Sequence, residues 1–305
     1  MTTQWQNALP HPTAFVLSGG AALGAIQVGM LQALTAVHLH PDIIVGTSAG
    51  SLNGAVIAEQ GLPAATDTLT RLWQNFTREN FFPGSWVSQV KQFLTTRNSL
   101  FPNDRLAALI SQVTHVTCIE EMPIPFGALA TALDNFHGVL FTAGNLQLAL
   151  MASAAIPGIY PPVEIQNRLF VDGALTAHVP LKAALLMGAK SLVVLDAGEI
   201  CHQKRTPRHS AEMLLATMHV AMRQRVRVEA PIIAQQVPLL YLPTPCPIST
   251  AVLDFSESRQ LIEQARQMAT DFLAHAPIPV AGKMSGAPHF HNHEPVIQLM
   301  QIASA

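Results

Sequence analysis

The feature that most constrains the fold is a pair of similar units near the N-terminus. In each unit a short apolar run is followed by a loop of small residues and then by a segment with helical spacing of apolar residues. The first unit has the run 14–17, the loop SGGAALG and a helix predicted from 25 to about 37. The second has the run 43–45, the loop GTSAG and a helix predicted from 49 to about 59. Strands that are apolar on both faces belong in a parallel sheet covered by helices on both sides. The sequence therefore predicts a three-layer α/β/α fold with a mainly parallel central sheet.

Further apolar runs extend this pattern. Strands are predicted at 126–133, 139–142, 168–171, 191–195 and 239–242, and helices at 145–152, 180–187, 212–228 and 256–274. The segment 62–112 reads as an aromatic, less regular insertion. No linker divides the chain, so we expect one domain over residues 1–305, with a core at about 14–275 and a C-terminal tail at 276–305.

Small residues recur at every fourth position in the first two predicted helices. They form two stripes, Ala25–Gly29–Ala33 and Gly50–Gly54–Ala58. Because residues four apart lie on one face of a helix, each stripe predicts that a neighbouring backbone approaches closely there.

Composition excludes several classes of protein. Of the 305 residues 49% are hydrophobic and 12% charged, and the formal net charge is −2, which argues against non-specific nucleic-acid binding. Three widely separated cysteines, with no C-x-x-C pair, predict free thiols in a reducing compartment and neither a disulfide scaffold nor a zinc site. No Lys or Arg precedes the first apolar run, and no apolar stretch reaches the ~18 residues of a membrane span. We expect a cytoplasmic location.

The segment Gly46-Thr47-Ser48-Ala49-Gly50 has two interpretations. It is either an ordinary turn between a strand and a helix, or a G-x-S-x-G nucleophile elbow that exposes the serine at a sharp bend. The five-residue pattern alone does not decide between them, so its context must.

The loop Ser18–Gly24 also has more than one interpretation. As a dinucleotide-binding loop it departs from the Gly-x-Gly-x-x-Gly pattern, because the spacing that ends on Gly24 puts Ala21 where the second glycine must be. The candidate ribose-binding acid, Asp42, precedes its strand instead of ending it. No Gly-Lys-Ser/Thr follows, which excludes a P-loop. The other use of such a loop is to donate backbone N–H groups to an oxyanion, and adjacent parallel strands would bring it beside Ser48.

A serine nucleophile needs a base. Asp172-Gly173 follows the apolar run 169–171, although Asp-Gly alone is most often a turn. The α/β-hydrolase order of Ser, acid and His is excluded on architecture, since only two predicted strands precede Ser48.

Three motifs in one order carry a family resemblance. The chain has Gly19-Gly20-Ala21, then Gly46 to Gly50 around Ser48, and then Asp172-Gly173-Ala174. This set resembles the patatin-like phospholipases, as do ASAAIPGIYPPVEI before the aspartate and LDFSESRQLIEQA near the C-terminus. The resemblance extends over roughly residues 14–275.

The resemblance implies a serine acylhydrolase of the phospholipase A or lipid acyl hydrolase type. Ser48 would be the nucleophile, Asp172 its base, and the backbone around Gly19, Gly20 and Ala21 the oxyanion hole. It implies no metal or organic cofactor, a lipid or acyl-ester substrate and a transient contact with a membrane surface. The alternatives are a catalytically silent member of the family that binds lipid or acts as a scaffold and, less favoured, a nucleotide-binding Rossmann reductase. The sequence assigns no oligomeric state.

The chain departs from the family pattern at three places. Ala21 replaces the third glycine, where its N–H remains a donor if its φ is negative. Leu23 replaces the basic residue, which puts a preference for phosphate headgroups in doubt. His178 replaces the asparagine after the aspartate; we expect its side chain to bond to loop backbone, although it is also an alternative base.

Three other segments carry weaker signals. The alternating histidines of HFHNHEP at 289–295 favour a polar tail over a metal site. The basic run Arg223, Arg225 and Arg227 predicts a solvated helix face. The face formed by Trp86, Val90, Phe93 and Leu94 predicts packing on the core, with a lid or interfacial patch as the alternative.

Overall fold

The computed structural model describes residues 4–76, 101–198, 210–246, 248 and 254–288. Within them an eight-stranded sheet has the order β5-β6-β3-β2-β1-β7-β8, and β4 also pairs with β3. The strands are β1 (Thr13–Leu17), β2 (Ile43–Thr47), β3 (Phe126–Ala132), β4 (Gly138–Phe141), β5 (Val163–Ile165), β6 (Arg168–Asp172), β7 (Ser191–Leu195) and β8 (Leu239–Tyr241).

The sheet has a parallel part and an antiparallel part. Strands β3, β2, β1, β7 and β8 are parallel to their neighbours in that series. Strands β4 and β6 pair antiparallel with β3, and β5 pairs antiparallel with β6. The expectation of a mainly parallel sheet is confirmed, with an antiparallel edge that the apolar runs do not distinguish.

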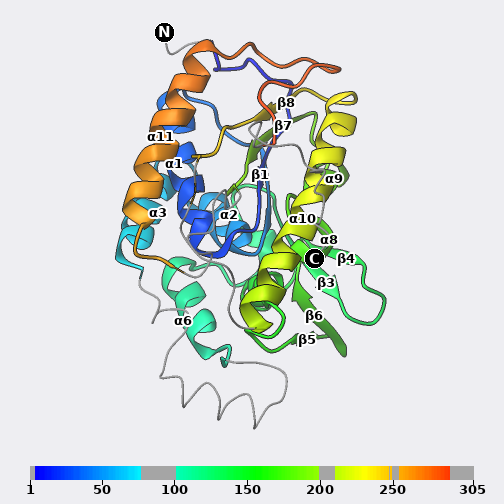
Figure 1. The fold of residues 1–305 in the computed structure, drawn as a ribbon. Coiled ribbons are helices and arrows are strands. Elements are labelled where there is room, and N and C mark those ends of the chain that lie inside the picture. The colour runs from blue at the N-terminus through cyan, green and yellow to red at the C-terminus, as the bar shows by residue number, and fades with distance from the viewer. Residues whose placement is uncertain (1–3, 77–100, 199–209, 247, 249–253, 289–305) are drawn as a thin grey trace, which may run out of the picture.

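Helices cover both faces of the sheet, as Figure 1 shows. One layer contains α1, α2, α3, α6, α7 and α11, and the other contains α9 and α10, with the short α8 beside α10. Their bounds are α1 (Ala25–Ala36), α2 (Ala49–Gln60), α3 (Ala64–Asn75), α6 (Asp104–Val113), α7 (Leu146–Ser153), α8 (Ala174–Ala177), α9 (Leu181–Leu186), α10 (Ser210–Ala234) and α11 (Ser258–His275). Two 3-10 turns, η1 (Ala21–Gly24) and η2 (Ile119–Glu121), complete the described elements.

Alternation along the strands explains the three layers. Phe15 and Leu17 of β1 belong to the core under α1 and α11, whereas Ala14 and Val16 belong to the core under α9 and α10. Because successive side chains of a strand point to opposite faces, a fully apolar strand needs cover on both sides. The three-layer prediction is confirmed.

The first small-residue stripe has the predicted function. A Cβ on Gly29 would lie 2.1 Å from the carbonyl oxygen of Ile262, so only glycine lets α1 and α11 pack at this separation. In Figure 1, α11 lies alongside α1 on the outer surface of that layer.

The expectation for 62–112 was wrong where the structure describes that segment. It contains α3 and α6, which are amphipathic helices: α3 buries Ala65, Leu69 and Trp73 at intervals of four, and α6 buries Leu106, Leu109 and Ile110. Strand β5 was also missed because it is short, and it joins β6 through Gln166 and Asn167, both with positive φ.

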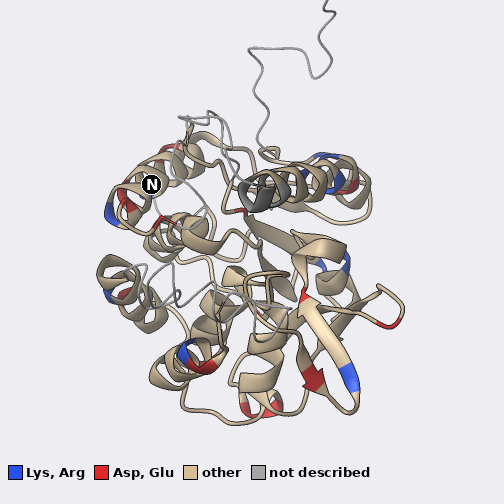
Figure 2. Ribbon diagram, turned by 60° about the horizontal axis from the view of Figure 1, so that its bottom comes forward, with Lys and Arg blue, Asp and Glu red and all other residues tan. Residues whose placement is uncertain are grey.

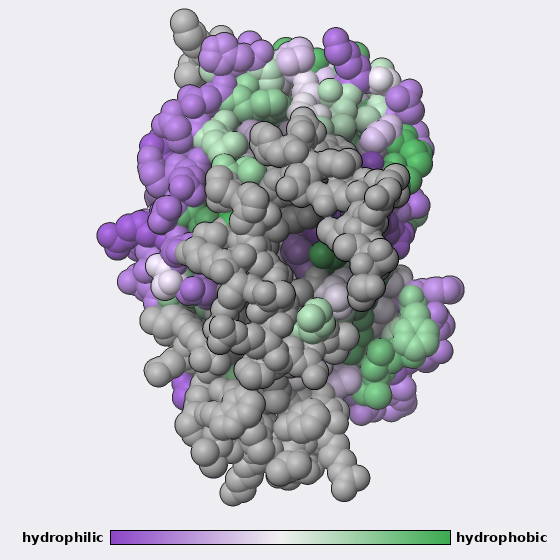
Figure 3. Space-filling view, in the orientation of Figure 1, coloured by the Kyte–Doolittle hydropathy of each residue, from purple (hydrophilic) through white to green (hydrophobic). Residues whose placement is uncertain are grey.

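Charge is sparse on the described surface. Figure 2 shows charged positions scattered over the periphery of the ribbon, and Figure 3 shows a hydrophilic flank where α11 faces outward. None of the described helices is long and apolar enough to cross a membrane. The first part of the predicted tail continues the sheet edge, since the Tyr241 N–H donates to the Ser285 carbonyl oxygen at 2.7 Å.

Candidate active site

Ser48 lies at a strained turn between β2 and α2. Its φ and ψ are 54° and −126°, which is an unusual conformation for a residue other than glycine, and the residue is only 5% exposed. The flanking glycines make this bend sterically possible. A Cβ on Gly46 would lie 2.3 Å from the Gly50 carbonyl oxygen, and one on Gly50 would lie 2.4 Å from that of Ser18. The turn has the geometry of a nucleophile elbow.

Asp172 reaches Ser48 on the antiparallel strand β6. It pairs with Ala130 of β3, next to Leu129, which pairs with Thr47 of β2. Strand β6 therefore runs back toward the elbow and ends level with it. A Cβ on Gly173 would lie 2.1 Å from the Leu129 carbonyl oxygen, so the residue after Asp172 must be small.

The carboxyl group of Asp172 is 4% exposed, and burial raises its pKa to about 6. The nearby Ser48 hydroxyl and the Ala174 N–H, which is 2.8 Å from Oδ1, both oppose this rise. A carboxylate with a raised pKa is a stronger base than one in water, and this one lies beside a serine hydroxyl.

The end of α7 holds both residues in place. Ser153 Oγ accepts a hydrogen bond from the Ser48 N–H at 3.0 Å and donates one to the Leu129 carbonyl oxygen at 2.6 Å. The Ala155 carbonyl oxygen accepts from the Asp172 N–H at 2.9 Å. Sequence reasoning noted ASAAIPGIYPPVEI only as a family-like segment. Its functional signal is the small, polar Ser153, which fits between the elbow and β3.

The glycine-rich loop contributes fewer candidate donors than expected. The Gly19 N–H already donates to the His178 carbonyl oxygen at 2.9 Å. Within the described residues, the structure gives no hydrogen bond from the Gly20 or Ala21 N–H, and both residues line a pocket that includes Ser48. Ala21 has a φ of 46°, not the negative value expected of an alanine donor.

A series of hydrogen bonds between buried side chains supports the glycine-rich loop. Trp73 donates to Asn53 at 2.8 Å, and Asn53 donates to Gln27 at 2.8 Å. Gln27 in turn donates to the carbonyl oxygens of Ser18 and Leu195, at 2.8 and 3.1 Å. The loop is thereby tied to α1, α2 and α3. Leu23, at the position of the family's basic residue, is fully buried in the core.

The basic run on α10 was predicted wrongly at Arg223. Its side chain is 1% exposed, and its Nη1 donates to both carboxylate oxygens of Asp196 at 2.6 and 2.7 Å. Tyr241 also donates to this carboxylate. Asp196 follows β7 and lies at the edge of the sheet, where it attracts this arginine to a buried position. Helical periodicity in the sequence does not reveal such an acceptor. Arg225 is half exposed, as expected.

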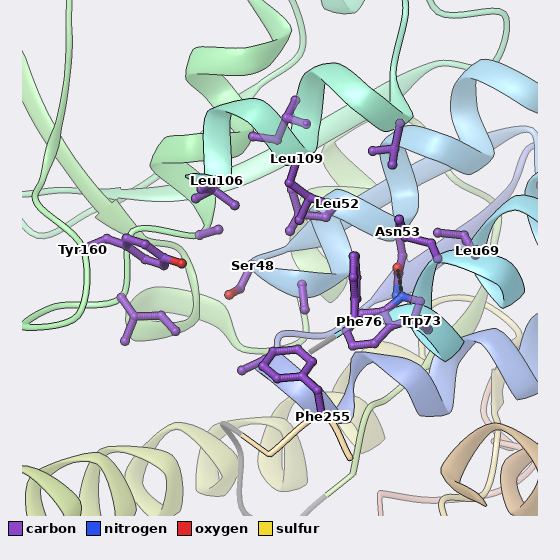
Figure 4. A pocket seen from close by; sticks show the side chains of 17 residues that line it. Ser48, Leu52, Asn53, Leu69, Trp73, Phe76, Leu106, Leu109, Tyr160 and Phe255 are labelled. Carbon is purple, nitrogen blue, oxygen red and sulfur yellow. Dashed lines mark hydrogen bonds between the residues drawn. The ribbon is translucent and has the colours of Figure 1, made fainter. Parts of the chain in front are cut away.

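A first pocket extends from Ser48 between α2, α3 and α6. Figure 4 shows Ser48 at its centre, with Leu69 and Trp73 on one side and Tyr160 on the other. Its lining is almost wholly apolar and includes Leu52, Leu69, Trp73, Phe76, Leu106 and Phe255. The Tyr160 hydroxyl points in the direction of Ser48 in this view, and burial raises the pKa of that hydroxyl above its usual value.

A second pocket meets the first at Ser48 and Ala21. It also contains Asp172, and its other walls come from α8, α10 and the loop after α7. Among the described residues, the polar side chains that line it, apart from Ser48 and Asp172, are those of His178 and His219. The His178 side chain does not bond to loop backbone as expected; its carbonyl oxygen does.

Other candidate residues lie elsewhere. Asp42 precedes β2 and accepts from the Thr13 N–H at 2.6 Å, so it is at the opposite edge of the sheet from the glycine-rich loop, where a Rossmann acid would not lie. Among the described residues, no group of three or more His, Cys, Asp or Glu side chains could hold a metal ion. The segments 79–94 and 289–295 lie outside the described residues.

Comparison with known proteins gives relatives over the region of these motifs. The chain is 30% identical over 190 residues to the mouse patatin-like phospholipase domain-containing protein 7, and 27% identical over 197 residues to lysophospholipase NTE1 of Mycosarcoma maydis. Each match includes 61% of this chain but only 13% and 10% of the relative. This chain therefore corresponds to a small part of those proteins.

Solved structures of low sequence identity also align with the fold. VipD from Legionella pneumophila aligns with a TM-score of 0.42 at 11% identity, over 87% of this chain and 67% of that one. Human GIVD cytosolic phospholipase A2 aligns with a TM-score of 0.41 at 12% identity, over 88% and 59%.

A family model also matches this region of the chain. The model of the patatin-like phospholipases matches residues 15–185, which is more than half of the chain and includes the glycine-rich loop, the elbow and the Asp-Gly motif. The chain therefore belongs to the patatin-like phospholipase family.

Proposed function

We propose that this protein hydrolyses carboxylic esters of lipids by a Ser48–Asp172 dyad. Ser48 Oγ attacks the acyl carbonyl carbon while its proton passes to the Asp172 carboxylate. The tetrahedral intermediate collapses, and the alcohol leaves with that proton. Water then attacks the acyl-serine ester, with Asp172 again taking and returning a proton, so that the fatty acid is released and Ser48 is restored.

The observation that carries the proposal is the contact between a strained, buried serine and a carboxyl group whose pKa burial raises to about 6. An ordinary aspartate, with a pKa near 3.9, accepts a serine proton poorly. Desolvation brings the pKa toward neutrality, where a general base works best. No other acidic residue lines either pocket in the described part of the chain.

The oxyanion is assigned to the Gly20 N–H, because the positive φ of Ala21 does not meet the condition of a negative φ for its N–H as a donor. The Gly20 N–H lacks another acceptor within the described residues and lies beside Ser48, and the N-terminus of α2, which begins directly after Ser48, adds positive potential. Each donor of this kind contributes about 10²- to 10³-fold in rate.

The first pocket would hold the acyl chain. Its walls, as far as the structure describes them, offer apolar contact and almost no polar group, and their one side-chain amide, that of Asn53, is already bonded to Gln27 and Trp73. Each methylene buried there contributes about 0.8 kcal/mol. This construction favours fatty acyl esters over short or polar acyl groups.

The test is a panel of acyl esters of increasing chain length, with a fluorophosphonate probe as a second measure of serine reactivity. We expect hydrolysis and labelling by the native protein, with the label on Ser48 by peptide mapping, and loss of both in Ser48→Ala. Ser111→Ala, which changes an exposed serine on α6, is the matched control and should behave like the native protein. Lipid binding without labelling or turnover would instead support a silent lipid-binding protein.

A further inference from the structure

His178 is a buried polar side chain that lines the second pocket and that the proposed mechanism does not use. It is 4% exposed, and neither ring nitrogen has a hydrogen-bond partner among the residues that the structure describes. Leaving a buried polar group unpaired destabilises a protein, and most such groups in folded proteins have a partner. The imidazole lines the second pocket, so a ligand there can supply one.

The position of the imidazole is fixed by its surroundings. The His178 carbonyl oxygen accepts from the Gly19 N–H, which ties the residue to the glycine-rich loop. Its ring meets that of His219 edge to face, with centroids 5.8 Å apart. Burial lowers the pKa of His178 to about 3, and the positive charge of Arg223 acts in the same direction. The ring is therefore neutral and presents one donor and one acceptor nitrogen.

The second pocket is on the correct side of the site for the alcohol part of an ester. An acyl chain in the first pocket directs the ester oxygen away from it, and Asp172, which returns the proton to the leaving alcohol in the proposed mechanism, lines only the second pocket. Ser48 and Ala21 line both pockets and mark the junction.

The chemistry of the second pocket favours a neutral polar group. No Lys or Arg is among the described residues that line it, and Arg223, whose charge acts on His178, is bonded to Asp196. The remaining lining is largely apolar, including Ile156, Leu175, Met218 and Met222. An anionic group would find no counter-charge there, whereas a hydroxyl would find the imidazole.

We propose that the second pocket binds the alcohol part of the ester and that His178 forms a hydrogen bond with a free hydroxyl on it, so that the protein prefers esters of polyols to esters of simple alcohols. The proposal rests on the proposed function, because it assigns the acyl chain to the first pocket. His178 acts here as a specificity residue and takes no part in the proton transfers.

The test compares two esters with the same acyl chain and the same number of alcohol carbons, 1-oleoylglycerol and propyl oleate. The native protein should prefer the glycerol ester in kcat/KM. His178→Leu should reduce this preference about 10-fold, the effect of one hydrogen bond of roughly 1.4 kcal/mol, because kcat/KM falls more for the glycerol ester than for propyl oleate. His178→Asn, which keeps a donor and an acceptor, should retain most of the preference.

Two further measurements keep the outcome decisive. Leu175→Ala changes the same pocket without a polar group and should affect both esters alike. If it lowers the preference as much as His178→Leu, pocket shape is the cause and the proposal is overturned. An unchanged preference in His178→Leu also overturns it. His178→Met is the second non-bonding variant, should the leucine variant fail to fold.

Binding to Ser48→Ala separates this proposal from the proposed function. In that background the affinities for the two esters should differ in the same direction, and His178→Leu should remove the difference. If the native protein hydrolyses neither ester but the binding preference is present and depends on His178, the hydrolase proposal fails and the recognition proposal stands. Equal affinities in both backgrounds contradict the recognition proposal.

Discussion

The two pockets that meet at Ser48 are built in opposite ways. The first is enclosed by helices α2, α3 and α6, and its polar side chain Asn53 is satisfied by protein partners. The second is enclosed by α8, α10 and a loop, and it contains His178, whose ring nitrogens lack partners within the described residues. A pocket whose polar groups all have hydrogen-bond partners selects ligands by size and apolar area. A pocket with an unpaired polar group selects ligands by the hydrogen bonds they can form. The comparison suggests that chain length and alcohol identity are selected separately.

The largest expected effect on catalysis comes from replacing Asp172, which lines the second pocket and not the first. Asp172→Asn should reduce kcat by about 10³-fold or more, since an amide cannot accept the serine proton, while binding of the acyl chain in the first pocket persists. The check is single-turnover hydrolysis with a ligand-affinity measurement on the same sample. Asp134→Asn, an exposed aspartate paired with Arg168, is the matched control, and turnover by Asp172→Asn equal to this control would contradict the dyad.

The same residue predicts two pH effects. The acid limb of kcat/KM should fall near pH 6, because the base must be ionised and the pKa of Asp172 is raised to about 6. The stability of the folded protein should instead decrease over the same pH range. The pKa of this carboxyl group is higher in the folded protein than its unfolded value of 3.8, so the free energy of unfolding falls as the pH rises from about 4 through 6, by about 3 kcal/mol.

Asp172→Asn should therefore raise the melting temperature relative to the native protein, increasingly so across that pH interval. Thermal unfolding of both proteins at pH 4, 5, 6 and 7 tests this difference. A constant difference over the four pH values would show that the carboxyl group is not destabilised by burial.

The second effect concerns the free energy of unfolding and the buried Arg223–Asp196 ion pair. Arg223→Met leaves Asp196 buried without its cation, and we expect a loss of about 3–5 kcal/mol in the free energy of unfolding. The double variant Arg223→Met with Asp196→Asn removes both charges and should recover a large part of that loss. Chemical denaturation measures both. Equal stability of the single and double variants would mean that the ion pair is not the source of the effect.

The third effect alters the first pocket only. Leu72 is half-buried on α3 and lines this pocket, so Leu72→Trp should shorten it. We expect kcat/KM for oleoyl esters to fall about 10- to 100-fold, with butyryl esters within about threefold of the native protein. The preference for glycerol over propyl esters should not change. A change in alcohol preference would show that the two pockets do not select independently.

The smallest effect is at the junction of the pockets. Ala21 has a φ of 46°, where glycine is favoured. Ala21→Gly should relieve this strain and change stability by at most about 1 kcal/mol, in the stabilising direction, with activity toward both kinds of ester nearly unchanged. Melting temperature and kcat/KM are the measurements. Substantial destabilisation would indicate that the methyl group packs usefully in both pockets.

The sequence predicted the parallel core well because its strands are apolar on both faces and its glycines stand at close backbone contacts, as at Gly29 and Gly46. Motif order brought Ser48 and Asp172 into one hypothesis, although the chain gives no sign that β6 runs antiparallel to carry Asp172 there. Ser153 and the ion pair of Arg223 were not predicted, because each depends on a partner distant in sequence. Helices α3 and α6 were missed although their buried residues recur at helical spacing.

The packing of α11 against α1 has a consequence for how the protein is made. Residues near both ends of the described chain meet there, since Trp5 donates to the Leu273 carbonyl oxygen at 2.8 Å, and Gly29 lies against the backbone of Ile262. Contacts of such long sequence separation form late. Helix α1 follows directly from η1, so the glycine-rich loop gains its final support only when α11 has been synthesised. A nascent chain that already contains Ser48 and Asp172 would thus lack the packing partner of α1 until synthesis has passed residue 275.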